Sequence, residues 1–169
     1  MDNEFDGGWD DKIVPKNSKA IFEDNLFTNN FARSGGAVLV SQNQYITTFL
    51  RCQMQFNTAR FGSAMFLEFS TIKFVHGSAS SNTATLYGAV RLAGEAEITL
   101  EYTEMNNNIA QEGAAIYAND NTTVTIAYST LSSNVALENG GGIYVNDATQ
   151  LSMNKTSMIG NRALRGSGG

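Results

Sequence analysis

The sequence predicts an all-β fold, a parallel β-helix solenoid of about six coils that are each 25–27 residues long. Three observations lead to this prediction. The pattern Asn-x-Ala recurs at regular intervals, and the short apolar runs between its copies alternate with a period of two residues. No stretch of the chain shows a sustained apolar stripe with helical period and helix caps, which argues against a solenoid of helical repeats.

The Asn-x-Ala pattern defines the coils. Successive copies are 27, 25, 26, 26 and 27 residues apart, and each is followed by a Gly-containing corner. In a solenoid, each repeat buries its apolar face only against its neighbours, and equivalent residues of stacked coils form columns. We therefore expect the asparagines to form a hydrogen-bonded ladder along the axis, made of Asn30, Asn57, Asn82, Asn108, Asn134 and Asn161.

The segments between the corners have the pattern of half-buried strands. Ile98, Leu100 and Tyr102 alternate with polar residues, and the segments 123–127 and 150–154 repeat this alternation. Such a pattern indicates strands with one face in the core and the other in water. Each repeat is expected to supply two or three short strands joined by Gly, Asn and Ser turns.

Three further columns follow from the same alignment. Cys52 falls among small residues, so a packing role is favoured over a reactive one. The corner glycines suit a positive φ or a close approach between coils, and they are Gly35, Gly62, Gly113 and Gly166. An apolar residue that plugs the core stands three positions before each Asn, namely Phe27, Met54, Ala79, Met105, Leu131 and Met158. Only Ala79 is undersized, and we expect Phe74 to fill that layer.

One column is predicted to point outward and to form a binding surface. If Val38 and Val40 face the core, their neighbour Leu39 faces solvent. Large side chains at equivalent positions, flanked by small residues, would make a flat and largely apolar stripe of the kind that marks interfaces. Stacking on sugar rings, or simple pairing along the strand ladder, would explain the same column. Its members are Leu39, Phe66, Arg91, Tyr117 and Tyr144.

Two short motifs recur together in the repeats. Phe27 to Asn30 is followed by Gly35-Gly36-Ala37-Val38, and looser copies occur around Asn108 and Asn134. They resemble the paired FxxN and GGA[ILV] motifs of the chlamydial polymorphic outer membrane proteins, over roughly residues 21–169. The resemblance implies a right-handed parallel β-helix of the autotransporter passenger type. It also implies adhesion or display at a cell surface or outside the cell, and not catalysis.

Composition and charge exclude several classes of partner. Five of the 16 acidic residues precede the first basic residue, whereas the rest of the chain has 11 acids and 11 bases. We interpret residues 1–20 as an acidic segment or cap, and 21–169 as β-helix repeats from a longer solenoid. The sequence has no basic stripe, so we do not expect a nucleic-acid partner. It also has no apolar run long enough for a transmembrane helix. The acidic start is also unlike a signal peptide.

The sequence offers no catalytic constellation, and we expect no enzyme activity, cofactor or metal. Glu68 and Glu95 could stack on neighbouring coils, as a carbohydrate-active β-helix would need, but a solvated edge explains them as well. His76 lies in a Gly- and Ser-rich segment and is expected at the surface. The acids around Gly7 and Gly8 offer oxygen atoms to calcium, without the spacing of a known binding loop: Asp6, Asp10 and Asp11.

Together these observations predict a non-catalytic structural or adhesive repeat protein. Its flat outer faces would bind a protein partner, or alternatively a glycan. A second interpretation is an accessory structural subunit whose stripe is buried against a neighbour in a larger assembly. A third, which the sequence supports less, is a carbohydrate-active β-helix of the polysaccharide lyase or hydrolase kind.

Overall fold

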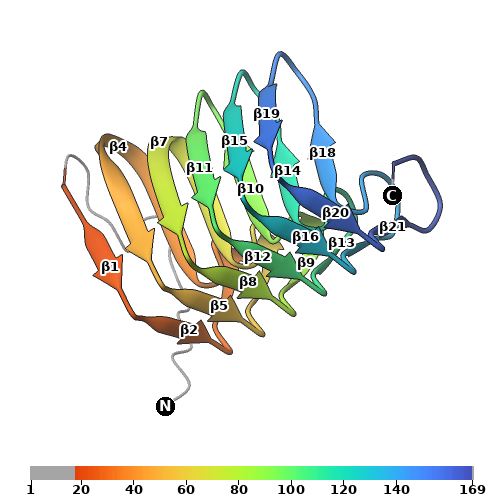
Figure 1. The fold of residues 1–169 in the computed structure, drawn as a ribbon, viewed down its shortest axis with the longest axis horizontal. Helices are drawn as coiled ribbons and strands as arrows, with labels where there is room; N and C mark the ends of the chain where they lie inside the picture. Colours follow the sequence, from red (N-terminus) through yellow and green to blue (C-terminus); the bar gives the residue numbers. More distant parts are fainter. Residues whose placement is uncertain (1–17, 169) are drawn as a thin grey trace.

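A computed structural model describes residues 18–168, which form a parallel β-solenoid of about six turns (Figure 1). Every strand pair in it is parallel, so the predicted all-β solenoid is confirmed. The first strand, β1, begins at Ile21. The acids weighed above as calcium ligands, Asp6, Asp10 and Asp11, lie outside the described residues, and the division of the chain at residue 20 stays a prediction.

Two six-stranded sheets form two of the faces of the solenoid (Figure 1). Sheet I contains the short strands that precede each Asn-x-Ala copy: β2 Leu26–Thr28, β5 Gln53–Gln55, β8 Ser78–Ser80, β12 Glu104–Asn106, β16 Thr130–Ser132 and β20 Ser157–Ile159. Sheet II contains the strands that follow the Asn: β3 Phe31–Ser34, β6 Thr58–Phe61, β9 Thr83–Tyr87, β13 Ile109–Ala110, β17 Val135–Ala136 and β21 Arg162–Ala163.

The remaining nine strands form sheet III, which has two arms. The first arm contains β10 Val90–Ala93, β14 Ile116–Ala118 and β18 Ile143–Val145. The second contains β1 Ile21–Glu23, β11 Glu97–Glu101, β15 Thr123–Ala127 and β19 Gln150–Asn154. Two long strands run through both arms and join them, β4 Val38–Leu50 and β7 Met65–Val75.

The corners explain why a coil can hold four strands where the sequence predicted two or three. In the coil that contains β9 to β12, the backbone turns at Glu95 and Tyr102, whose φ angles are 59° and 51°. Residues other than glycine rarely adopt this left-handed conformation, and they do so mainly in turns. The apolar alternation continues through these corners, so it does not reveal where one strand ends and the next begins.

The corner glycines act as the sequence predicted. Gly35, Gly62 and Gly113 have φ angles of 64°, 59° and 56°. A Cβ atom at Gly35 would overlap the carbonyl group of Val38, three residues further on. At Gly166 the reason is close approach, because a Cβ atom there would overlap the side chain of Asn139 on the neighbouring coil.

The core lies along the axis and consists of the inward-facing columns. Val38 and Val40 are fully buried, whereas Leu39 between them is partly exposed, as the period of two predicts. In the coil of the undersized Ala79, a Cβ atom at Gly77 would overlap the Phe74 ring. Phe74 is fully buried, and its ring occupies the core space beside Gly77. A residue larger than glycine at position 77 would need the same space.

Candidate binding surface

The six repeat asparagines lie in one column at the corner between sheets I and II. For each pair of neighbouring coils, the backbone N–H and the side-chain Nδ2 of one Asn donate to Oδ1 of the next. Asn57, Asn82, Asn108 and Asn134 are fully buried. The Nδ2 of Asn108 also donates to the Ala79 carbonyl oxygen of the preceding coil, at 2.9 Å. The column thus satisfies buried backbone groups and offers a ligand no surface in these four coils.

The predicted outward column lies in register across five strands. Leu39 pairs with Phe66, and Phe66 with Arg91. Arg91 then pairs with Tyr117, which pairs with Tyr144. The strands that carry them are β4, β7, β10, β14 and β18, so the first arm of sheet III presents a continuous line of large side chains.

Two aromatic residues that the sequence interpretation missed lie beside this column. Phe61 and Tyr87 end strands β6 and β9 of sheet II, and their ring centroids are 5.7 Å apart. Each stands directly before a corner glycine, Gly62 or Gly88. This recurring aromatic-Gly pair is the feature of the sequence from which the two residues could have been predicted to share a column. We call the combined set the aromatic–arginine stripe: Leu39, Phe61, Phe66, Tyr87, Arg91, Tyr117 and Tyr144.

The expectation that Tyr117 is exposed is wrong, because only 7% of its surface is accessible. Its ring stacks on Tyr87 with centroids 4.2 Å apart and on Tyr144 at 5.1 Å. Tyr87 reaches Tyr117 from sheet II across the corner, and the alternation along a single strand does not reveal such a contact. Burial, together with the neighbouring Tyr87 and Glu112, raises the pKa of Tyr117 to about 12.

Arg91 lies at the centre of the stripe. Its guanidinium carbon is 4.8 Å from the ring centroid of Tyr87 and 4.9 Å from that of Tyr117, within the range of cation–π contacts. Nη1 donates to Asn119 Oδ1 at 3.0 Å. In the described part of the chain Arg91 forms no ion pair, and burial lowers its pKa. The stripe therefore holds a positive charge beside the stacked rings of Tyr87 and Tyr117, without a carboxylate in contact.

A second outward column runs along the corner between the second arm of sheet III and sheet I. His76 stacks on Tyr102 with ring centroids 4.7 Å apart, and Tyr102 stacks on Tyr128 at 4.9 Å. Lys155 Nζ lies 5.0 Å from the Tyr128 ring centroid. His76 is exposed, as predicted from its Gly- and Ser-rich surroundings. The column itself was not predicted, although its residues follow the period of the repeat.

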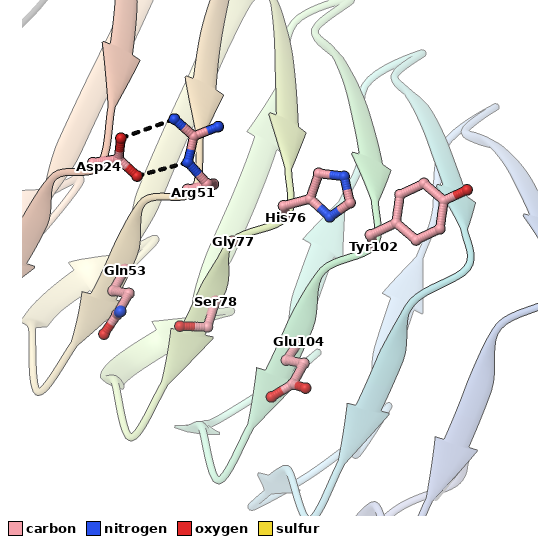
Figure 2. Close-up of a pocket in the computed structure, with 8 residues that line it drawn as sticks. All are labelled: Asp24, Arg51, Gln53, His76, Gly77, Ser78, Tyr102 and Glu104. Atoms are coloured by element: carbon pink, nitrogen blue, oxygen red, sulfur yellow. Dashed lines mark hydrogen bonds and ion pairs between the residues drawn. The ribbon is translucent and has the colours of Figure 1, made fainter.

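A shallow concavity of about 440 Å³ lies at the first coils of this corner column (Figure 2). At one end, the Arg51 guanidinium donates to both carboxylate oxygens of Asp24, at 2.7 and 2.8 Å, and also pairs with Glu23. The hydrogen bond from Arg51 lowers the pKa of Asp24, although burial opposes it. His76 and Glu104 also line the concavity. Residues 18–168 nevertheless bring together no group of His, Cys, Asp or Glu side chains suited to a metal ion.

Glu68 and Glu95, considered above as a possible acidic pair on neighbouring coils, are not in register. Glu68 pairs with Ala93, and Glu95 lies at the corner two residues further on. Asn57 and Asn82 are 25 residues apart. The residue that pairs with Glu68 on the next coil is therefore also 25 positions further on, at Ala93. Glu68 instead accepts a hydrogen bond from Ser41 Oγ at 3.1 Å.

Residues 128–146 match the family model described as the Chlamydia polymorphic membrane protein repeat. The matched segment begins at Tyr128 of the corner column, passes through Asn134 of the ladder and includes Tyr144 of the stripe. The resemblance predicted from the FxxN and GGA[ILV] motifs is therefore confirmed. Comparisons with curated proteins and with solved structures gave no match. In residues 18–168, no helix is long and apolar enough to cross a membrane.

Proposed function

We propose that this solenoid, which carries a polymorphic membrane protein repeat, is a non-catalytic adhesive segment displayed at a cell surface, where the aromatic–arginine stripe binds a protein partner. The repeat match supports the surface role, because the matching family is one of membrane proteins. The stripe supports the binding role, because Tyr and Arg are enriched among the residues that contribute most to protein interfaces.

The environment of Arg91 is the observation that carries this proposal. An Arg guanidinium has five N–H donors, and the described residues engage one of them, through Asn119. The rings of Tyr87 and Tyr117 hold the planar group in place, so little conformational freedom is lost when a partner binds. A carboxylate from a partner would complete this site through charge-assisted hydrogen bonds.

The charges around the stripe favour one acidic side chain over a polyanion. Asp120 and Glu68 lie close enough to Arg91 to oppose the lowering of its pKa. They would repel a densely charged polymer, whereas a single Asp or Glu flanked by apolar side chains would match the cation and its aromatic surroundings. The proposed partner is therefore a protein segment of that composition.

Surface display is tested on intact source cells. Treatment with proteinase K before lysis should remove the protein from the intact cells, while a cytoplasmic marker protein survives. If the protein survives on intact cells and is digested only after lysis, the proposed location is wrong.

The binding role is tested by placing a photo-crosslinking phenylalanine analogue at Phe66, with Phe31 as the matched control. Phe31 is 65% exposed and lies on β3 of sheet II, outside the stripe. Position 66 should give an adduct with one protein that position 31 does not give. The purified partner should then bind the wild type, and the variant Phe66→Ser with Tyr144→Ser should bind at least about tenfold more weakly, a loss typical of interface anchors.

The control for that loss is Phe31→Ser with Ile109→Ser, a change at two exposed apolar positions of sheet II. This variant should bind the partner as the wild type does. Tyr117 is left unchanged because it is buried, and its replacement would disturb folding as well as binding. Equal binding by the wild type and the Phe66→Ser, Tyr144→Ser variant would refute the role of the stripe.

A permanent subunit of a larger assembly is the second candidate, favoured by the continuity of the stripe along five strands of sheet III. The native mass of the gently extracted protein separates the two. A stable complex of fixed composition indicates a structural subunit, whereas a chain that meets its partner only at contact with another cell indicates an adhesin.

A further inference from the structure

We infer that the concavity at the corner column is a binding site for a short neutral oligosaccharide. This inference concerns a different face of the solenoid from the aromatic–arginine stripe and does not rest on the function proposed above. It is drawn from the shape of the concavity, from the polar groups that line it and from the rings at its edge (Figure 2).

The shape arises from one small residue in a column of larger ones. Ser78 lies in register between Gln53 of β5 and Glu104 of β12, and all three begin their strands. Figure 2 shows the three side chains along neighbouring strands of sheet I, with His76 and Tyr102 projecting from the adjoining corners. The short side chain of Ser78 leaves a hollow between its two longer neighbours.

The lining suits hydroxyl groups, which both donate and accept hydrogen bonds. Gln53 offers an amide with donors and an acceptor, Ser78 a hydroxyl group, and Glu104 a carboxylate that only accepts. The cation of the site, Arg51, is already paired with Asp24 and Glu23. An anionic ligand would therefore find no free positive partner there and would be repelled by Glu104. A neutral sugar meets neither difficulty.

The rings at the edge supply apolar contact of limited area. His76 stacks on one face of Tyr102 and Tyr128 stacks on the other, so the 49% of the Tyr102 surface that remains exposed is the edge of the ring. The C–H groups of a sugar ring can pack against this exposed surface while its hydroxyl groups reach sheet I. The concavity is shallow and buries little apolar area, so we expect a Kd on the order of 1 mM for a single site.

The lining residues come from four successive coils, from Asp24 to Glu104. Coils stack at about 4.8 Å, so the site spans about 14 Å along the axis. That length fits a linear oligosaccharide that lies parallel to the axis and crosses the strands. Many copies of such a weak site on one surface would bind a polysaccharide with much higher avidity than one copy does.

The test is an NMR titration of the isotope-labelled, purified chain with a panel of neutral oligosaccharides, from which the best-bound sugar is chosen. The sugar should shift the backbone amide signals of Gln53, Ser78 and Glu104. It should leave those of Phe66 and Tyr144 on the stripe unchanged. If no oligosaccharide of the panel shifts the signals of Gln53, Ser78 and Glu104 with a Kd below about 10 mM, the inference is wrong.

A pair of matched variants locates the site. Ser78→Tyr fills the hollow, whereas Thr130→Tyr places the same side chain in the same column two coils further on, beyond the concavity. Both positions are half-buried and outward-facing, so the two substitutions have comparable effects on folding. We expect Ser78→Tyr to weaken sugar binding at least about tenfold and Thr130→Tyr to leave it unchanged. Equal binding by the two variants, whether retained or lost, overturns the assignment.

A third variant keeps the test decisive if Ser78→Tyr does not fold. Gln53→Ala removes one hydrogen-bonding group from an exposed position and should weaken binding by about fivefold, the effect of one hydrogen bond. Unchanged binding by Gln53→Ala would exclude the amide from the site and contradict the inferred lining.

Discussion

Asn108 is joined to Asn134 of the next coil by two hydrogen bonds that share one acceptor. The backbone N–H and the Nδ2 of Asn108 donate to Asn134 Oδ1, at 3.0 and 2.9 Å. The same Nδ2 also reaches back to the Ala79 carbonyl oxygen. One side chain therefore connects three coils, and its repetition along the axis couples the coils to one another.

Asn108→Leu should destabilise the solenoid strongly. The substitution removes the oxygen that accepts hydrogen bonds from the backbone N–H and the Nδ2 of Asn82. It also removes the Nδ2 that donates to the Ala79 carbonyl oxygen, and these hydrogen bonds are buried. Unsatisfied buried groups cost about 1–3 kcal/mol each, so we expect a loss of about 3–5 kcal/mol in the free energy of unfolding, measured by urea denaturation. Adding Asn134→Leu should lower stability further. A neutral result would mean that the column does not support the fold.

The matched control for this prediction is Asn30→Leu in the first coil. The Asn30 side chain is only partly buried and makes one hydrogen bond within the described residues, to Asn57 Oδ1. Its replacement should cost about 1 kcal/mol. Equal losses at positions 30 and 108 would contradict the dependence on burial.

Gly77→Ala should destabilise the protein by overpacking. The new methyl group would overlap the buried Phe74 ring, and forcing extra atoms into a packed core costs about 1–3 kcal/mol. Gly160→Ala is the control, because a Cβ atom there would meet only the Ser133 hydroxyl oxygen, at an ordinary contact distance of 3.9 Å, and its cost comes from the φ of 63° alone. The double variant Gly77→Ala with Phe74→Leu should lose less than the sum of the single changes. Additive losses would show that the two positions do not compete for space.

The stability of the wild type should fall as the pH rises from about 10 towards 12. The unfolded Tyr117 ionises near pH 10, whereas burial raises the folded pKa to about 12. Over this window the unfolded state binds fewer protons than the folded state, so the free energy of unfolding decreases with pH. Tyr117→Phe should show a shallower decrease in urea titrations at pH values across this window. The same slope for both proteins would contradict the raised pKa.

Much of the fold could be predicted from the sequence because a solenoid repeats its own geometry. The spacing of the asparagines fixed which residues share a column, and the alternation at Val38, Leu39 and Val40 fixed which face the core. Register then followed for the outward column from Leu39 to Tyr144. In such a fold each coil contacts only its neighbours, so local pattern and tertiary contact carry the same information.

The surfaces could not be predicted as completely, because their contacts cross the corners between sheets. The burial of Tyr117 depends on Tyr87, which belongs to another sheet and reaches it around a glycine corner. Glu68 and Glu95, which the sequence allowed to stack, are out of register because coils of unequal length take up the extra residues at corners, where the alternation gives no register. The concavity depends on one short side chain, Ser78, whose effect is visible only beside its neighbours in the column.

Cys52→Thr should leave stability within about 1 kcal/mol of the wild type, although Cys52 is fully buried. The Cys52 Sγ lies 3.4 Å from the Phe22 carbonyl oxygen of the preceding coil. Thr103 occupies the equivalent position two coils further on, and its hydroxyl group donates to the Phe74 carbonyl oxygen at 3.2 Å. A threonine at position 52 can therefore make the hydrogen bond that this column already contains.

The measurement is again urea denaturation, with Cys52→Leu as the control that should lose about 1–3 kcal/mol through overpacking. Because burial protects the thiol, the native wild type should also fail to react with a thiol reagent until it unfolds. Rapid labelling of the folded protein, or a loss above about 2 kcal/mol in Cys52→Thr, would show that Cys52 does more than fill its column.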